Sequence, residues 1–443
     1  MALVPDKWKA DGIKSTDFKG IEENEVLLQE ITRAVPLKLL LDHKAGSLAA
    51  ASDKSALTSS HFFLSTPVKT LGAFISHRWS ADPTSTVYAL IIHVWFTGAV
   101  SCLGMPPVLA LVLLVLAFAF VCIILYPPFV IPVVPLFAFF LNVIFYLTAR
   151  SDGLLTCLGY GKARYWYDKS TVHQTTNTLT QAGLHLFSHY LKKSEALVIL
   201  FQPEYLTRVW CVYELAWWLS QKKEKGISFV PINTYNTLAR VLASVFPKAI
   251  AMICIIIALL LTWGLTCIKL VQIALPEWII LGGLGVLFLG VLCITACIGA
   301  CFAKMIIDPA KKERLAVAAQ FRAFEVRDTV AFNPSDRDFV LKQICHWWSS
   351  QGKGDEAALD AFNAYMRTTV GPKLGELQRR RERVIIIIAL AICFSIDVYI
   401  FVFITILCEW PGGPTDTFEA PRCRCDACAS AAVLLPLCLR LPC

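Results

Sequence analysis

Charged residues are scarce in this sequence. They make up 17% of its 443 residues, whereas an average soluble domain contains roughly 25%. Hydrophobic residues make up 56%, and many of them gather in apolar runs of the length that crosses a bilayer, which is about 20 residues. The composition therefore predicts a membrane protein with about five transmembrane helices. We expect these helices at residues 108–126, 129–148, 249–268, 278–303 and 384–408.

Several signatures of known chemistry are also missing. The first twelve residues hold no apolar run, which argues against a cleaved signal peptide. Neither H-E-x-x-H nor G-x-S-x-G occurs in the sequence. The stretch around Tyr160 is not a phosphate-binding loop, because Thr156 and Ala163 stand where Gly and Ser or Thr are needed. His185 and His189 are four residues apart, but no acid or cysteine near them supports a metal site.

Basic residues are clustered along the chain. Lys and Arg gather in segments 149–248 and 304–383, with "AKKER" after the fourth apolar run and "RRRER" before the fifth. Positive charge beside a span marks the cytoplasmic side of a membrane. We therefore expect a multi-pass membrane protein whose partner is the lipid bilayer, with a cytosolic domain and an extracellular or lumenal tail. Nucleic acid is not an expected partner, because no recognition motif accompanies the basic runs.

These features divide the chain into eight segments. Three expected cytosolic segments can build one domain, because each intervening pair of spans returns the chain to the same side. The segments are a polar N-terminal part and linker (1–70), a first domain segment (71–107), a hairpin of spans (108–148), the main domain segment (149–248), a second hairpin (249–303), a basic helical segment that could complete the domain (304–383), a last span (384–408) and a Cys-rich tail (409–443).

Three features of this layout leave alternatives open. Residues 87–105 are either a sixth span or a buried helix, and we favour the buried helix because His93 lies within them. Asp397 lies in the middle of the last predicted span, where an acid either faces a partner or bonds to Ser395 as a neutral group. The tail cysteines fit disulfides, a weak zinc site with Cys438, or acylation of Cys408.

The expected cytosolic segments alternate between strand and helix patterns. Short apolar runs predict strands at 72–75, 163–168, 196–201, 227–232 and 329–332, and helices are expected at 24–41, 178–191 and 210–221. This alternation predicts a parallel sheet with helices on both faces, and such a sheet binds ligands at the carboxyl ends of its strands. The residues expected there are Ser76, His77, Arg78, Asp168, Gln202 and Asn233.

Two stretches resemble a known family. "AFISHRWSAD" is similar to the first strand and following loop of Toll/interleukin-1 receptor (TIR) domains, and "SEALVILFQPEYLTRVWCVYEL" is similar to their third strand and next helix. The second match keeps the order and spacing of the family through Trp210, Cys211, Glu214 and Leu215. The whole resembles TIR-like proteins of protists in which "ISHRW" and "WCVYELA" occur together. The resemblance implies a flavodoxin-like parallel sheet, assembled here from split segments, together with the predicted transmembrane helices.

The resemblance also implies an activity. Enzymatic members of the family hydrolyse NAD at the nicotinamide–ribose bond, and their catalytic glutamate occupies the motif position of Glu214. NAD is then the substrate and no cofactor is needed. The residues expected to line the site are Ser76, Arg78, Asp168 and Trp210. The alternative is a non-catalytic signalling module that works by self-association, in which Glu214 forms a structural ion pair. Both alternatives imply a homo-oligomer that forms through the TIR-like domain.

Overall fold

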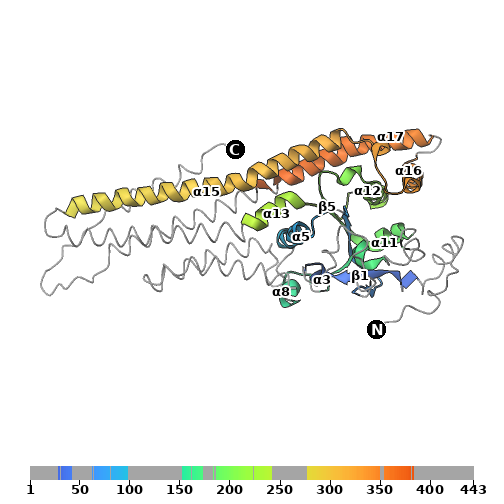
Figure 1. The fold of residues 1–443 in the computed structure, drawn as a ribbon, viewed down its shortest axis with the longest axis horizontal. Coiled ribbons are helices and arrows are strands. Elements are labelled where there is room, and N and C mark those ends of the chain that lie inside the picture. Colours follow the sequence, from blue (N-terminus) through green and yellow to red (C-terminus); the bar gives the residue numbers. More distant parts are fainter. Residues whose placement is uncertain are drawn as a thin grey trace. The chain divides into compact units, whose positions relative to one another are not determined.

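The computed structural model describes part of the chain (Figure 1), and all of that part belongs to one compact unit within residues Met1–Phe403. For most of 277–303 it describes the backbone alone. The described residues are 28–29, 31–41, 62, 64–79, 81–97, 152–160, 162–172, 183, 186–222, 224–241, 277–349, 354–380 and 382–383.

A six-stranded sheet forms the centre of this unit, with the strand order β2-β1-β4-β3-β5-β6. The four strands from β4 to β6 are parallel, and β1 pairs with β4 and β2 in the antiparallel sense. When these four parallel strands are numbered by their order in the chain, their order across the sheet is 2-1-3-4. This is the order of flavodoxin-like sheets. The strands are β1 (Arg33–Pro36), β2 (Thr66–Pro67), β3 (Leu71–His77), β4 (Arg164–Trp166), β5 (Ser194–Phe201) and β6 (Ile227–Pro231).

Helices cover both faces of the sheet, as Figure 1 shows for α5 and α13 on one side and α11 and α12 on the other. The helices before β6 are α3 (Leu37–Leu41), α5 (Pro83–Thr97), α8 (Asp152–Cys157), α9 (Asp168–Thr171), α11 (Phe187–Lys193), η6 (Tyr205–Thr207) and α12 (Val209–Lys222). Those after β6 are α13 (Ile232–Arg240), α15 (Glu277–Arg322), η8 (Val326–Asp328), α16 (Pro334–Trp348), α17 (Asp355–Tyr365) and η9 (Met366–Val370).

The central strand β5 shows why the sheet has two cores. Successive side chains of a strand point to opposite faces. Leu197 and Ile199 accordingly pack into the core beneath α11 and α12, while Val198 and Leu200 pack into the core beneath α5 and α13. Because both faces are covered, β5 has a nearly continuous apolar sequence, as buried parallel strands do.

The sheet differs from the wholly parallel one predicted from the sequence. Residues 24–41 were expected to form one helix. Among the described residues of this segment, 28, 29, 31 and Leu37–Leu41 are helical, but Arg33–Pro36 is a strand. Pro36 explains the change, since the residue before a proline is disfavoured in the helical conformation. The strand expected at 329–332 is reduced to a single bridge between Val330 and Arg208. The sheet is therefore mixed, with two antiparallel strands at one edge.

The transmembrane part of the predicted fold is wrong for the described residues. Among them, no helix combines the length and the apolar character that crossing a bilayer requires. Residues 278–303 lie in α15, and this single helix continues to Arg322 through charged residues such as Lys304 and Asp308. The apolar run is thus part of a longer helix of mixed character. This finding also corrects the expectation of a multi-pass membrane protein with a cytosolic domain.

The other predicted spans, at 108–126, 129–148, 249–268 and 384–408, lie outside the described residues, and so does Asp397. Of the 87–105 segment, the structure describes residues up to Thr97, as part of α5. His93 is 7% exposed there and is one of the buried residues of α5. The described part of this segment is therefore a buried helix.

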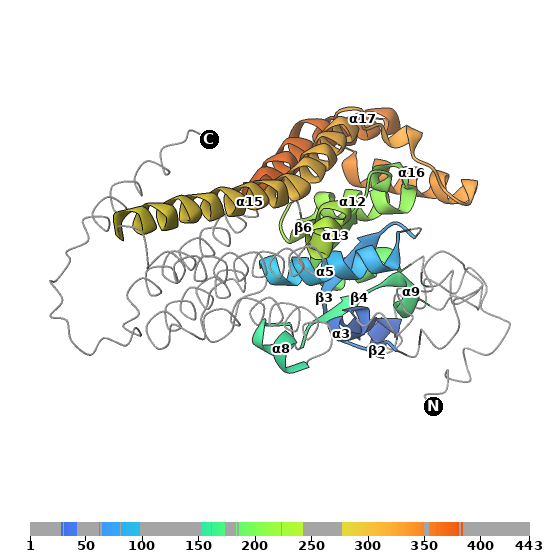
Figure 2. The ribbon, with the colours of Figure 1, turned by 60° about the vertical axis from the view of Figure 1, so that its left-hand side comes forward.

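The helices after α15 pack against α12 and extend the core on that side of the sheet. Figure 2 shows the segment after α17 running beside α15, where Arg314 Nε lies 2.9 Å from Glu382 Oε1. Trp348 of α16 reaches α12, and its Nε1–H donates to the Ala216 carbonyl at 3.3 Å. These contacts make the C-terminal helices part of the same unit as the sheet.

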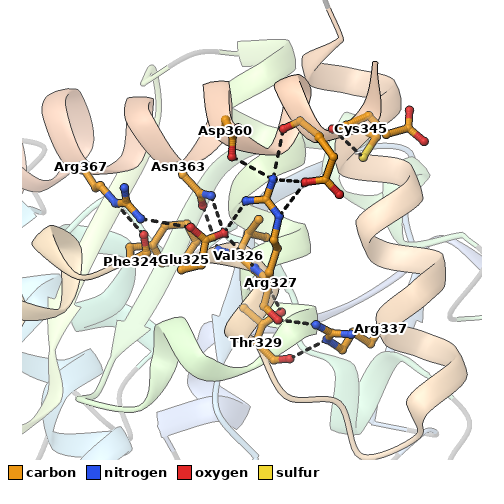
Figure 3. A network of polar contacts seen from close by, with 12 residues as sticks. Phe324, Glu325, Val326, Arg327, Thr329, Arg337, Cys345, Asp360, Asn363 and Arg367 are labelled. Atoms are coloured by element: carbon orange, nitrogen blue, oxygen red, sulfur yellow. Dashed lines mark hydrogen bonds and ion pairs between the residues drawn. The ribbon is translucent and has the colours of Figure 1, made fainter. Parts of the chain in front are cut away.

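A polar network fixes the turn between α15 and α16 (Figure 3). Asn363 of α17 accepts a hydrogen bond from the backbone N–H of Val326 at 2.9 Å. The guanidinium nitrogens of Arg327 lie 2.8 Å from Glu325 Oε1, 2.5 Å from Glu356 Oε2 and 2.8 Å from Asp360 Oδ1. Several of these groups are solvated, so each ion pair contributes only about 0–1 kcal/mol. The buried Asn363 bond therefore specifies the geometry of the turn more than the ion pairs do.

Candidate functional site

Glu214 is a buried acid at the carboxyl ends of the parallel strands. It lies on α12 with 7% of its surface exposed, and its carboxyl interacts with the Ser76 hydroxyl at the end of β3. The second carboxyl oxygen, Oε2, has no hydrogen-bond partner among the described residues. A buried polar atom without a partner costs free energy, and such atoms concentrate at functional positions.

The hydroxyl of Tyr205 also contributes to the surroundings of Glu214. It hydrogen-bonds to the Ser76 hydroxyl, and its O–H is 3.3 Å from the Cys211 carbonyl. Tyr205 is fully buried in the short η6 helix that follows β5. Ser76 is therefore held between the acid and the phenol, and its own position is fixed by β3.

Burial raises the pKa of Glu214 well above its usual value, and the negative charge of Asp168 raises it further. The hydrogen bond from Ser76 acts in the opposite direction, because it stabilises the ionised form. Burial is the largest of these effects. The acid is thus neutral more often than an exposed glutamate at the same pH, and a nearby cation would favour its ionised form.

A second polar cluster surrounds Asp168 at the end of β4. Asp168 accepts hydrogen bonds from the Trp79 indole N–H and, at 2.7 Å, from the Lys169 backbone N–H. The Lys169 side chain is buried and donates to the Trp79 carbonyl at 3.2 Å. Burial lowers the pKa of Lys169 to about 8, and the neighbouring Asp168 limits this change.

His77 is the last residue of β3 and lies beside this cluster. Its Nε2 is 3.7 Å from Asp168 Oδ1, and its ring packs 4.7 Å from the ring of Tyr167. Burial lowers the pKa of His77 to about 4, although the charge of Asp168 opposes this change. The imidazole is therefore neutral at physiological pH.

Of the four residues predicted to line the site, Ser76 and Asp168 interact with Glu214. Arg78 is instead paired with Glu204, at 2.7 Å between Nη1 and Oε2. Trp210 donates from its indole nitrogen to Asp336 of α16 at 3.1 Å and packs on Phe339. The aromatic face of α12 thus contacts the C-terminal helices, while Glu214 is directed to the end of β3.

Several residues of these clusters have no site role in the sequence-based prediction. His77 was expected at the strand ends but not in the site, and no role was predicted for Lys169 or Tyr205. Their positions in the sequence could have indicated these two residues, because Lys169 follows Asp168 directly and Tyr205 lies in the third-strand motif. Gln202 also ends a strand, and its buried Oε1 has no hydrogen-bond partner among the described residues. Asn233 is exposed.

The structure gives no support to a metal centre in the residues that it describes. No group of three or more His, Cys, Asp or Glu side chains within them could hold a metal ion. His189 contacts the Thr32 hydroxyl at 3.0 Å, and His185 lies outside the described residues. What the fold and the site define is an α/β domain with a flavodoxin-like strand order and a buried acid where its parallel strands end.

Comparison with known protein families, with characterised proteins and with solved structures finds no match for this chain.

Proposed function

We propose that this protein is a TIR-like enzyme that hydrolyses NAD at the bond between nicotinamide and ribose. The observation that carries the proposal is the position of Glu214. Its buried carboxyl lies beside Ser76 at the end of the central strand β3. This is where open α/β sheets of this strand order bind nucleotides. The resemblance of the segment around Glu214 to TIR enzymes supports the same role.

The chemistry suits a buried acid. When the glycosidic bond of NAD breaks, its electron pair returns to the pyridinium nitrogen, so nicotinamide leaves as a neutral molecule. Positive charge develops on the ribose ring, as in glycoside hydrolysis. A carboxylate in a dry site stabilises that charge more strongly than water does. Water then adds to C1′ and loses a proton, which completes ADP-ribose.

The raised pKa of Glu214 is compatible with this role. Burial favours the neutral acid. The substrate brings a pyridinium cation, and a cation within a few ångströms lowers the pKa of a carboxyl. Binding of NAD therefore favours the carboxylate that the reaction requires.

The test is nicotinamide release from NAD by the wild-type chain and by Glu214→Gln. The amide keeps the shape of the side chain but carries no charge, so we expect the rate to fall by about 100-fold or more. Glu313→Gln is the matched control, because Glu313 is also a buried glutamate with a raised pKa but lies on α15, bonded to Thr234. This control should retain at least half of the wild-type rate.

The assay is run over a range of protein concentrations, because the resemblance implies sites that are completed by self-association. Turnover per chain that rises with concentration supports such an oligomer. Equal nicotinamide release by the wild type and Glu214→Gln, or none from the wild type at any concentration, overturns the enzymatic proposal. Glu214 is then a structural acid, as in the non-catalytic alternative.

A further inference from the structure

His77 and Asp168 face each other without a direct hydrogen bond. Their closest side-chain atoms, Nε2 and Oδ1, are 3.7 Å apart, which is too long for a hydrogen bond. His77 is 7% exposed, and its Nε2 has no hydrogen-bond partner among the described residues. A buried ring nitrogen in this state is stabilised when a ligand supplies the missing partner.

The two side chains offer two hydrogen-bond acceptors. Asp168 is an acceptor whose orientation is fixed by the Trp79 indole N–H and the Lys169 backbone N–H. His77 is neutral near pH 7, because burial lowers its pKa to about 4. A neutral imidazole has one N–H, and the His77 ring already donates it to the backbone of Ile75, so the unpartnered Nε2 is an acceptor. The pair therefore suits a group that carries two N–H donors on one nitrogen.

The position of the pair relative to Glu214 indicates which part of a nucleotide would reach it. Ser76 and His77 are consecutive residues of β3, so their side chains point to opposite sides of the strand. Ser76 is directed to Glu214, and His77 to Asp168. A substrate lying across the end of β3 thus has its ribose on the side of Glu214 and its leaving group on the side of His77.

We infer that His77 and Asp168 form a subsite for the carboxamide of the nicotinamide ring. His77 Nε2 and Asp168 Oδ1 each accept one N–H of the amide nitrogen. This inference rests on the proposed function, since nicotinamide is the leaving group of NAD. The subsite would make the enzyme prefer NAD over its deamidated form. The deamidated substrate carries a carboxylate in place of the carboxamide, and this carboxylate has no N–H for Asp168 and is repelled by its charge.

The first measurement is binding of nicotinamide and of nicotinic acid to the wild-type chain by saturation-transfer NMR, with no turnover required. We expect nicotinamide to bind at least about tenfold more tightly, because one carboxylate oxygen replaces a donor that a buried acceptor needs. His77→Phe removes the ring nitrogens and should abolish detectable binding of nicotinamide. His93→Phe is the matched control, because His93 is equally buried, at 7% exposed, but lies on α5.

The second measurement is the ratio of kcat/KM for NAD to that for nicotinic acid adenine dinucleotide. The wild type should favour NAD by about 100-fold or more, as sites built to pair a substrate N–H do. Asp168→Asn removes the repelling charge and supplies an N–H, so it should lower the ratio at least tenfold. It should do so partly by raising kcat/KM for the deamidated substrate, a gain that damage to the fold would not produce. Circular dichroism checks that each variant is folded.

The outcomes separate this inference from the proposed function. Hydrolysis of both dinucleotides at equal rates overturns the subsite and leaves the enzyme in place. Binding of nicotinamide that His77→Phe abolishes, without any hydrolysis, supports the subsite and overturns catalysis. Equal binding of nicotinamide and nicotinic acid, or no binding of either, overturns the subsite whatever the rate of hydrolysis.

Discussion

At the level of single residues, the protein keeps an acid and an imidazole in their neutral forms by burying them. Burial moves their pKa values in opposite directions, upwards for Glu214 and downwards to about 4 for His77. Asp168 opposes the effect of burial at His77 but adds to it at Glu214. One carboxylate thus influences the groups on both sides of β3.

The neutral state of Glu214 has a consequence for stability. Its pKa is raised on folding, so its contribution to stability is complete below about pH 4.5, its value when unfolded. That contribution is lost as the pH rises towards the folded pKa. Glu214→Gln does not titrate, and its stability relative to the wild type should therefore increase between pH 4.5 and 8, by at most about 1.4 kcal/mol per pH unit.

This prediction is checked by urea unfolding of the two proteins across that pH range. Glu224→Gln provides a contrast of opposite sign, because hydrogen bonds from Lys373 and Tyr365 lower the pKa of Glu224. Its contribution is present above the unfolded pKa and lost as the pH falls. A stability difference between the wild type and Glu214→Gln that does not change with pH would mean that the carboxyl is solvated in the folded protein.

At the level of secondary-structure elements, the turn between α12 and β6 depends on one glycine. Gly226 has a φ of +72°, in the left-handed region that side chains disfavour. A Cβ there would meet the Glu195 carbonyl at 2.8 Å, and this backbone belongs to the central strand β5. Gly226→Ala should therefore lower the free energy of unfolding by about 1–3 kcal/mol. Gly375→Ala is the control, because a Cβ at that position would meet no atom within 4 Å.

Thermal and urea unfolding measure both glycine variants. In a helix, alanine is favoured over glycine by about 1 kcal/mol, so Gly375→Ala should be neutral or stabilising. If Gly226→Ala proved as stable as the wild type, the turn before β6 would have to adopt another conformation. The pairing of β6 with β5 would then not depend on Gly226.

The central strands and α12 could be predicted from the sequence because their signals are local. β5 is an uninterrupted apolar run, and α12 follows it at a short distance. The edge strand β1 could not, since its pairing with β4 joins residues far apart in the chain. The same distinction applies to the site. The position of Ser76 could be predicted because it lies at the end of β3. The contacts of Arg78 with Glu204 and of Trp210 with Asp336 could not, because no local pattern indicates them.

The prediction of a transmembrane helix at 278–303 failed for a related reason. It counted apolar residues in 278–303 without the residues that follow in the same helix. Composition describes the residues within a segment, whereas the length of a helix depends on the residues that begin and end it. In α15 no residue ends the helix between its apolar part and its charged part, and even Pro309 lies inside the helix.

For the unit as a whole, the C-terminal helices and the sheet share one core. Phe362 of α17 is fully buried in it, with its ring 5.0 Å from Trp348 and 5.7 Å from Phe324. Because that core also includes residues of α12 and β5, loss of the ring should weaken the entire unit. We expect Phe362→Ala to lower the free energy of unfolding by about 3–5 kcal/mol.

The matched control is Phe332→Ala, since Phe332 is 82% exposed and its removal should change stability by less than about 0.5 kcal/mol. The measurement is urea unfolding followed by tryptophan fluorescence and by far-UV circular dichroism. Fluorescence reports on the packing of the twelve tryptophans, which include Trp348 and those of α12, whereas circular dichroism reports on all helices and strands. If the two signals of Phe362→Ala shift together to lower urea, the helices after α15 and the sheet unfold as one cooperative unit. If fluorescence shifts alone, α16 and α17 form a separate layer, and the contacts of Trp210 and Trp348 do not couple that layer to Glu214.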